Sequence, residues 1–411
     1  MHGMPVSDNS IQSNMDWRKA NAAQIAHGLQ DLRTKTLAVF DAYVAADRLT
    51  LPYADELNPP LWELGHLAWF QEFWIGRNQQ RHLGVNYDAK HVRLESVCSD
   101  ADSWYDSGKV AHQARWQLPL LEPQACKNYL TKTLNQTLNL LTQAGEGDDD
   151  LYFYRLVMFH EAMHLEAAIY MAQAVGVDLE ANLTTKFTPN LIAIQATNTL
   201  AAGQFNYLKQ TFDLGSKNSR IDSSFDTGFA FDNESDSHPV EMAAFEIDSR
   251  CVHWGEYLKF VETTAHNLPR YVRRGLQVSK SGYENQVFGI WRPLDLQTTA
   301  VHISLAEAQN YCSWAGRRLP TEAEWELTAS TSPQNNFAWG EVWEWTSSTF
   351  APYPGFVAHP YLDYSEPWFG TRQVLRGACV ATQPMMKNVK YRNYFTPERT
   401  DIYAGFRTCK L

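Results

Sequence analysis

The segment HEAMHLEA, residues 160–167, contains two histidines four residues apart, followed closely by Glu166. Residues i and i+4 share one face of a helix, so His160 and His164 can reach a single metal ion. Glu166 lies about 200° around the helix from His164, so we expect it to support the helix rather than to bind the metal. Two histidines on an apolar helix face also occur as hydrogen-bonded core residues. The pair alone therefore leaves a metal site and a packed core equally open.

A third histidine favours the metal site. His66 lies in PPLWELGHLAWFQEFW (59–74), a segment that is otherwise largely aromatic. In a helical bundle, inward-facing side chains of different helices converge on one core site. Three histidine ligands leave coordination positions open, which is typical of a catalytic rather than a structural metal. Imidazole ligands alone do not distinguish zinc from iron.

Four long helices are predicted to position these histidines. Apolar residues recur at three- and four-residue spacing in four segments of the first half: 16–46, 59–78, 124–144 and 151–176. Pro59 and Pro60 suit the start of the second helix, and Gly176 suits the end of the fourth. The acidic run GEGDDD stands before the fourth helix, at the end where carboxylates are favourable. The long connection at 85–118 is a candidate functional loop.

The second half has a different residue composition and hydrophobic pattern. From about residue 185, turn-forming residues and aromatics separate short strand-like pieces. Two helical segments, 301–316 and 321–329, are the exceptions. The sequence therefore predicts an α+β protein with an N-terminal four-helix bundle at 1–185 and a second domain at 186–411.

Composition narrows the function classes. The formal net charge of −11 disfavours nucleic acid and anionic membranes, because both bind basic surfaces. No segment has the ~18 consecutive apolar residues of a membrane helix, and no apolar signal segment opens the chain. Six scattered cysteines without a CxxC motif fit a reducing compartment. We expect a cytoplasmic protein, a monomer or small homo-oligomer, that acts on small molecules.

The motifs resemble a known two-domain family. A distant histidine with an HxxxHxE motif resembles a DinB-type domain. The second half resembles the formylglycine-generating-enzyme/sulfatase-modifying domain, a C-type-lectin-like fold. The segments that carry this resemblance are AGRRLPTEAEWE (315–326), GEVWEWTSS (340–348), VLRGACVAT (374–382) and YRNYFTPERTDIYAGFR (391–407). The two domains in this order are similar to the sulfoxide synthases of ergothioneine biosynthesis and their relatives.

The resemblance implies a non-haem iron enzyme. Members of this family bind Fe(II) through three histidines and use O2 as co-substrate. They join a chalcogen nucleophile to C2 of the imidazole of hercynine, Nα-trimethylhistidine. Carried onto this sequence, the iron ligands are His66, His160 and His164. The open positions then serve to gather reactants that would otherwise meet rarely.

The segment WYDSGKVAHQARWQLPL (104–120) resembles the selenoneine synthase branch, whose donor is a selenosugar. The cysteine-using branch has a Tyr-Tyr pair near the place of Gly108 and Lys109. Phe395 stands where the γ-glutamylcysteine-using branch has an Asp, while Arg399 matches its Arg. The cysteine-using branch also has an aromatic residue at the Phe395 position. The alternative is therefore a hercynine sulfoxide synthase that forms a C–S bond with cysteine or γ-glutamylcysteine.

The resemblance also assigns substrate contacts between the domains. Met163, Asn393 and Tyr394 match positions that contact hercynine, with Met163 in place of a Gln. Asn393 would donate to the carboxylate, and Tyr394 would stack on the trimethylammonium group. Loop packing is the alternative for both residues. Arg115 lies near the place of a donor-binding Arg, and Tyr353 in PYPGF falls near a catalytic Tyr.

Two other function classes stay open. One is a zinc thiol transferase of the DinB type, in which the metal lowers the pKa of a thiol. The other is a non-catalytic binding protein with a degenerate lectin-like domain. Arg318, Glu322 and Glu326 are interpreted as structural ion pairs and caps. Cys379 and Cys409 do not form the copper-binding pair of formylglycine-generating enzymes, so a copper oxidase is disfavoured.

Overall fold

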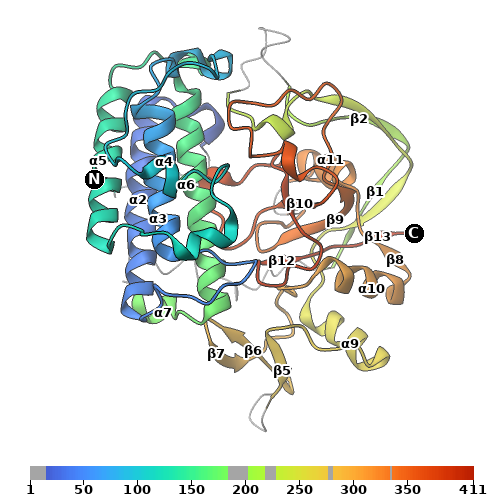
Figure 1. Cartoon of the computed structure of the whole chain (residues 1–411). Helices are drawn as coiled ribbons and strands as arrows, with labels where there is room; N and C mark the ends of the chain where they lie inside the picture. The colour runs from blue at the N-terminus through green and yellow to red at the C-terminus, as the bar shows by residue number, and fades with distance from the viewer. Residues whose placement is uncertain (1–14, 184–201, 218–227, 276–280, 334–335) are drawn as a thin grey trace, which may run out of the picture.

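A computed structural model describes residues 15–183, 202–217, 228–275, 281–333 and 336–411. A helical half and a sheet-rich half lie side by side, with the C-terminus on the outer side of the sheet-rich half (Figure 1). The architecture is the predicted α+β one. The predicted domain boundary at 185/186 lies outside the described residues.

The first half contains four long helices, at the places that the periodicity predicts. They are α2 (Ala22–Ala45), α3 (Pro60–Gln71), α5 (Pro123–Leu141) and α6 (Asp148–Val175). Pro60 is the first residue of α3, where its missing N–H has no intrahelical acceptor to lose. Gly176 ends α6 at φ 72°, a left-handed conformation that glycine adopts without strain.

Short elements complete this half. α3 passes directly into a π-helical turn, Glu72–Gly76, which widens the helix just beyond His66. Two one-turn α-helices follow, α4 (Ala101–Trp104) and α7 (Leu179–Asn182). The 3₁₀ turns of the whole described chain are Trp17–Lys19, Arg81–Asn86, His112–Gln117, Asp232–Glu234, Glu366–Trp368 and Pro384–Met386.

Short strands form small sheets in the second half. One sheet has the order β1-β4-β13-β8, with strands Gln204–Tyr207, Phe245–Asp248, Cys409–Lys410 and Arg317–Arg318. Another has the order β11-β10-β9-β12, with strands Asn393–Phe395, Gln373–Gly377, Trp343–Thr349 and Ala404–Gly405. In the second sheet β12 runs parallel to β9 and the other pairs are antiparallel.

Two smaller sheets lie at the margins. The β2-β3 pair consists of Gln210–Leu214 and His238–Met242, and the β5-β6-β7 sheet of Val272–Arg274, Tyr283–Val287 and Ile290–Pro293. The helices of this half are α9 (Trp254–Thr264), α10 (Leu305–Ala315) and α11 (Glu322–Thr331). Capping boxes start α10 at Ser304 and α11 at Thr321, which confirms the two predicted helices.

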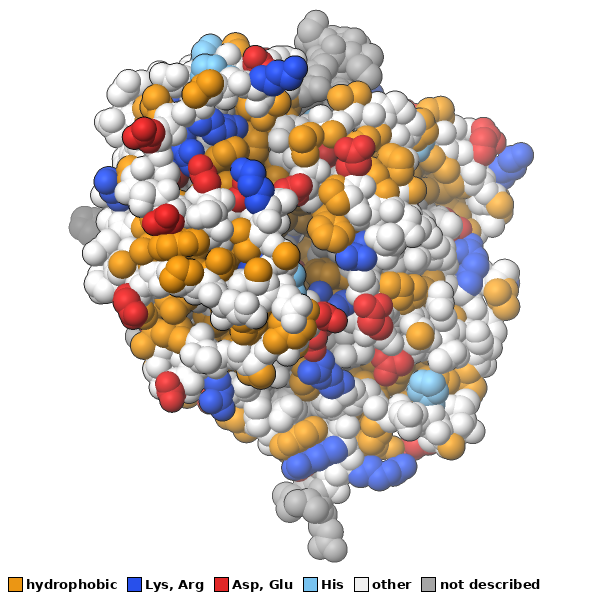
Figure 2. All heavy atoms as spheres, viewed as in Figure 1, with side chains coloured by type: hydrophobic (Ala, Val, Ile, Leu, Met, Phe, Trp, Pro, Cys, Tyr) orange, Lys and Arg blue, Asp and Glu red, His pale blue; other side chains and the backbone are white. Residues whose placement is uncertain are grey.

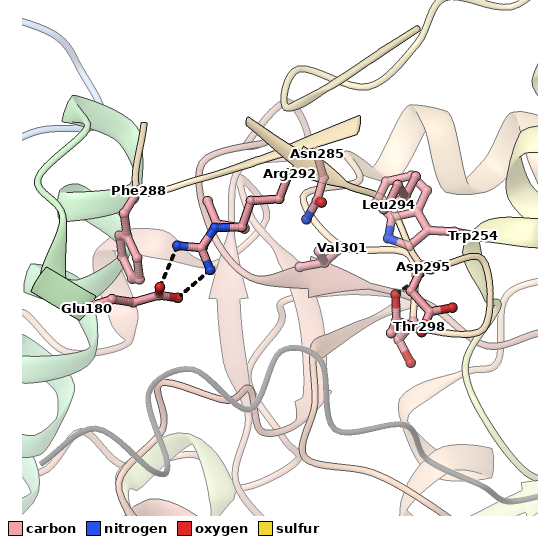
Figure 3. Close-up of a pocket in the computed structure, with 11 residues that line it drawn as sticks. Glu180, Trp254, Asn285, Phe288, Arg292, Leu294, Asp295, Thr298 and Val301 are labelled. Carbon is pink, nitrogen blue, oxygen red and sulfur yellow. Dashed lines mark hydrogen bonds and ion pairs between the residues drawn. The ribbon is translucent and has the colours of Figure 1, made fainter. Parts of the chain in front are cut away.

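Polar contacts join the two halves. Arg18 in the N-terminal segment pairs with Glu234, and both side chains are buried. Near the end of the bundle, Arg292 of β7 donates from Nη1 to Glu180 of α7 at 2.9 Å (Figure 3). These pairs, with the Glu166 contacts described below, hold the helical half against the sheets.

None of the described helices is long and apolar enough to cross a membrane. On the face shown in Figure 2, acidic and basic side chains are interspersed, and the basic ones do not gather in one large patch.

Candidate active site

Three histidines from two helices meet in the bundle core. His66 comes from α3, and His160 and His164 come from adjacent turns of α6. One ring nitrogen from each lies within 4.8 Å of the other two. The Nε2 atoms of His66 and His160 are 3.2 Å apart. Among the described residues this is the one group of three or more His, Cys, Asp or Glu with the spacing of a metal site.

Hydrogen bonds at Nδ1 orient two of the imidazole rings. Nδ1 of His66 donates to the carbonyl oxygen of Tyr105 at 2.7 Å, because a carbonyl can only accept. Nδ1 of His164 bonds to Oε2 of Glu63 at 2.5 Å. Both contacts leave Nε2 free to act as a ligand, the arrangement in which a carbonyl or carboxylate fixes a metal-binding imidazole. Gly65 makes the first contact possible, since a Cβ there would lie 2.2 Å from the Tyr105 ring.

Aromatic packing fixes the ring planes. Trp62 stacks on His66 with centroids 4.8 Å apart and planes 9° apart. Phe70 stacks on His160 at 3.5 Å and 4°. Trp62, His66 and Phe70 are spaced by four residues on α3, so one helix supplies a ligand and both stacking partners.

Two of the histidines, His66 and His160, stay neutral at ordinary pH. Burial, and next the charge of His164, lower the pKa of His66 to about 3. Burial, followed by the other two histidines, also lowers the pKa of His160. Burial would raise the pKa of Glu63, but the charge and hydrogen bond of His164 outweigh it and lower that pKa. His66 and His160 thus offer unprotonated nitrogens, the form that binds a metal.

A cavity of about 250 Å³ opens beside the histidines. It lies between α6 and the sheet-rich half, and aromatic side chains dominate its wall. Its lining residues are His160, Met163, His164, Glu166, Ala167, Tyr170, Trp343, Tyr361, Tyr364, Met386, Tyr391, Asn393, Tyr394 and Phe395. The donor set is three imidazoles with an open side toward the cavity. That set fits a catalytic metal with free positions better than a closed structural site.

Four of the predicted substrate contacts line this cavity, namely Met163, Asn393, Tyr394 and Phe395. Sδ of Met163 accepts from the hydroxyl of Tyr391 at 3.4 Å. Tyr394 stacks on Phe350 at 4.0 Å, so one face of its ring is covered. Its hydroxyl donates to the carbonyl of Tyr364. The tyrosine ring is therefore held rigidly at the cavity wall.

The structure does not bring Tyr353 to the lining of this cavity. Its ring packs against His238 and Arg392, and its hydroxyl donates to Glu322 at 3.2 Å. Eight residues later, Tyr361 lines the cavity with its ring centroid 5.9 Å from that of His160. The loop between the two tyrosines has no regular period, so the sequence could not place either ring.

Arg399 and Arg115 lie near the cavity without lining it. Arg399 donates two hydrogen bonds of 2.6 Å to Asp401, so its guanidinium is already paired with a carboxylate. Arg115 lies over the Trp62 ring at 3.8 Å and donates to Asn58 at 2.8 Å. Their roles as donor contacts stay predictions.

Several cavity residues had no signal in the sequence. Tyr361, Tyr364 and Tyr391 come from irregular segments of the second half, and Trp343 begins β9. Glu63, by contrast, could have been found. It stands three residues before His66 on the same helix, where a carboxylate faces the neighbouring turn.

Glu166 joins α6 to the sheets rather than to the histidines. Its carboxylate accepts from Trp343 Nε1 at 2.6 Å and from Thr382 Oγ1 at 2.5 Å. The structure also confirms the structural ion pairs predicted in the second half: Arg318 pairs with Glu324, Glu322 with Arg392, and Glu326 with Arg376.

Comparison with known proteins matches both halves. The sulfatase-modifying factor enzyme 1-like domain matches residues 194–341 and 338–410, more than half of the chain. The DinB superfamily matches residues 28–172. Hercynine oxygenase of Mycobacterium tuberculosis is 28% identical over 93% of this chain and 98% of its own length. Ergothioneine biosynthesis protein 1 of Schizosaccharomyces pombe is 22% identical over 92% of this chain and 55% of its own length.

Among solved structures, PvdO from Pseudomonas aeruginosa aligns with 51% of this chain and 94% of its own. The TM-score is 0.34 and the identity 17%, and no functional argument rests on it.

Proposed function

The chain belongs to the sulfatase-modifying factor enzyme 1-like family and carries the domain pair of the ergothioneine and selenoneine synthases; on that premise we propose that it joins C2 of the hercynine imidazole to the selenium of a selenosugar, using Fe(II) and O2. Relatives of nearly the same length are named hercynine oxygenase, and the chain is an oxidative enzyme. The selenium donor, the iron and the cytoplasmic location are parts of the proposal.

One observation carries the proposal. A cluster of three histidines, two of which line the cavity, stands beside aromatic walls with no lysine or arginine among the described lining residues. The one carboxylate there, Glu166, already accepts from Trp343 and Thr382. A zwitterionic cysteine donor would have to bury two more charges without partners, which is costly. A neutral sugar needs only hydrogen bonds and ring contacts.

The chain's own residues would bind and orient the reactants. Asn393 offers an amide N–H to the hercynine carboxylate, and the tyrosine faces of the cavity suit the trimethylammonium cation. Burial raises the pKa of Tyr361, so its phenol stays protonated and can donate a proton beside His160. Iron bound by His66, His160 and His164 would supply the activation of O2.

The reaction balances with one O2. The C2–H bond of hercynine and the Se–H bond of the donor are consumed, and a C–Se bond forms. These steps release two electrons, and oxidation of selenium to the selenoxide releases two more. One oxygen atom remains on selenium and the other leaves as water.

The names of the relatives favour a second candidate, in which sulfur replaces selenium. Hercynine oxygenase and ergothioneine biosynthesis protein 1 both fit a C–S bond-forming enzyme with cysteine or γ-glutamylcysteine as donor. The occupied guanidinium of Arg399 argues against a charged donor at this end of the cavity.

Competition between donors tests the proposal. Protein loaded with Fe(II) under anaerobic conditions is mixed with hercynine and one of four donors: a selenosugar, a thiosugar, cysteine or γ-glutamylcysteine. Oxygen is then admitted and products are followed by mass spectrometry. We expect a hercynine–selenosugar adduct as the main product, and none with the His160→Ala variant.

Each alternative has its own signature in this experiment. Turnover with cysteine or γ-glutamylcysteine but not with the selenosugar would establish the sulfur enzyme instead. Activity of the zinc-loaded protein without oxygen would establish a thiol transferase.

A further inference from the structure

A second, smaller cavity lies on the bundle side of His164. It has a volume of about 30 Å³ and lies between α2, α3 and α6. Its lining residues are Thr36, Val39, Phe40, Tyr43, Pro60, Glu63, Leu64, Leu67, His164, Leu165, Ala168 and Met171. A water-sized site needs roughly 10–15 Å³ by this measure, so the cavity has room for a diatomic molecule.

The cavity wall is chemically apolar. Most of it is aliphatic or aromatic, and two of the polar groups that border it have partners within the protein. Oε2 of Glu63 bonds to His164, and the hydroxyl of Tyr43 donates to the carbonyl of Ala168 at 2.6 Å. Among the described residues, the Thr36 hydroxyl is buried there without a partner. A buried water needs two to four polar partners, whereas dry apolar cavities take up xenon and similar molecules.

His164 separates the two cavities. It lines both, so its imidazole is a shared wall. The larger cavity, at about 250 Å³, is smaller than the roughly 300–1,000 Å³ typical of sites for drug-sized ligands. Hercynine and a donor together would fill it. A gas that reacts after both organic substrates have bound then has no free passage from that side.

We propose that the small cavity between α2, α3 and α6 binds dioxygen and delivers it to the three-histidine site from the side opposite the organic substrates. The chemistry that recognises the ligand is a mostly apolar wall with one unpaired hydroxyl, that of Thr36, which is too few polar partners for a buried water and does not suit hercynine or sugars. The inference rests on the proposed oxygen-dependent function, but the gas-binding property of the cavity can be measured separately.

Xenon tests binding without any turnover. Crystals of the metal-loaded protein are pressurised with xenon, and its anomalous signal is mapped. We expect xenon beside Val39 and Leu67, and its loss in Ala168→Leu, which fills the cavity from α6. Ala174→Leu is the matched control, because Ala174 is also a half-buried alanine of α6 but does not line the cavity. Absence of xenon from the wild-type cavity, or ordered water in its place, overturns the proposal.

Oxygen kinetics test delivery. The KM for O2 should rise severalfold in Ala168→Leu, while kcat/KM for hercynine at saturating O2 and the parameters of Ala174→Leu stay at wild-type values. Val39→Leu adds one methylene and serves if Ala168→Leu fails to fold. Loss of xenon with an unchanged KM for O2 overturns the delivery role. If wild-type protein binds xenon but never turns over hercynine, the proposed function fails and the cavity assignment stands.

Discussion

Two buried groups of ionisable side chains, one in each half of this protein, are satisfied in opposite ways. In the sheet-rich half, Arg407 is fully buried and makes two hydrogen bonds, of 2.5 and 2.6 Å, to Glu344. Its remaining donors reach the carbonyls of Asp248 and Ala338. In the helical half, His66 and His160 are as deeply buried. Their Nε2 atoms, which take no part in the supporting contacts, face mainly each other.

The difference separates structural from functional burial. A buried ion pair whose donors and acceptors are all used is a closed unit that only the fold needs. His66 and His160 lose hydration on burial and gain little in return until a cation arrives. Such an incomplete cluster, oriented by Tyr105 and Glu63, is the physical mark of a ligand site.

In the helical half, replacing a candidate metal ligand should abolish metal binding with little effect on stability. We expect His160→Ala to lose the metal and all turnover while the helix content and the unfolding temperature of the metal-free protein change little. Removing a neutral buried imidazole relieves crowding as much as it loses packing. Metal content by mass spectrometry and circular dichroism check this; an unchanged metal content would remove His160 from the site.

In the sheet-rich half, breaking the Arg407–Glu344 pair should lower stability and leave metal binding unchanged. Arg407→Met leaves the Glu344 carboxylate buried without its cation, which costs about 3–5 kcal/mol of unfolding free energy. We expect a large fall in the denaturant midpoint, with metal affinity unchanged in the fraction that folds. The partly exposed Lys35–Asp31 pair is the control, since Asp31→Ala should cost no more than about 1 kcal/mol. Equal costs for the two variants would contradict this account.

Removing Glu63 should have an intermediate effect on the metal site. Loss of a carboxylate that orients a metal-binding histidine typically lowers metal affinity about 10–100-fold. We expect this loss in Glu63→Ala and a smaller one in Glu63→Gln, whose amide oxygen can still accept from His164. Calorimetric titration with the metal measures both. An affinity as high as in wild type would show that His164 needs no such support.

Asp232 is a buried carboxyl group of the second half that has no cationic hydrogen-bond partner, so it contrasts with Glu344 within the same half. Its partners are the Ser365 hydroxyl and the His359 N–H. Burial raises its pKa to about 6, so the folded protein holds a proton that the unfolded chain has lost above pH ~4.

Stability should therefore fall as pH rises from about 4 to 6, by at most about 1.4 kcal/mol per pH unit from this group, and level off above that range. Denaturant unfolding across this pH range measures the slope. Asp232→Asn should flatten it, and an identical slope in the variant would assign the effect to other groups.

The fold was largely predictable because helix periodicity and capping are local properties. Four helices follow from apolar spacing, and Pro60 and Gly176 mark ends that their own backbone chemistry favours. The three histidines also follow, since i and i+4 on α6 must share a face. Tyr353 and Tyr361 differ in position although both lie in one irregular loop. No periodicity in that loop indicates which ring reaches the site.

The sequence by itself thus determined the helical bundle, the change of texture at the second domain and the three candidate ligands, because these depend on residues close along the chain. Only the tertiary structure decided which groups surround the ligands and which charges are already used. Asp401 is hydrogen-bonded to the Arg399 guanidinium, and Glu166 is hydrogen-bonded to the sheet-rich half. A small, mostly apolar cavity lies on the bundle side of His164. Each of these depends on packing between segments distant in sequence, where distance and burial rather than residue type decide the chemistry.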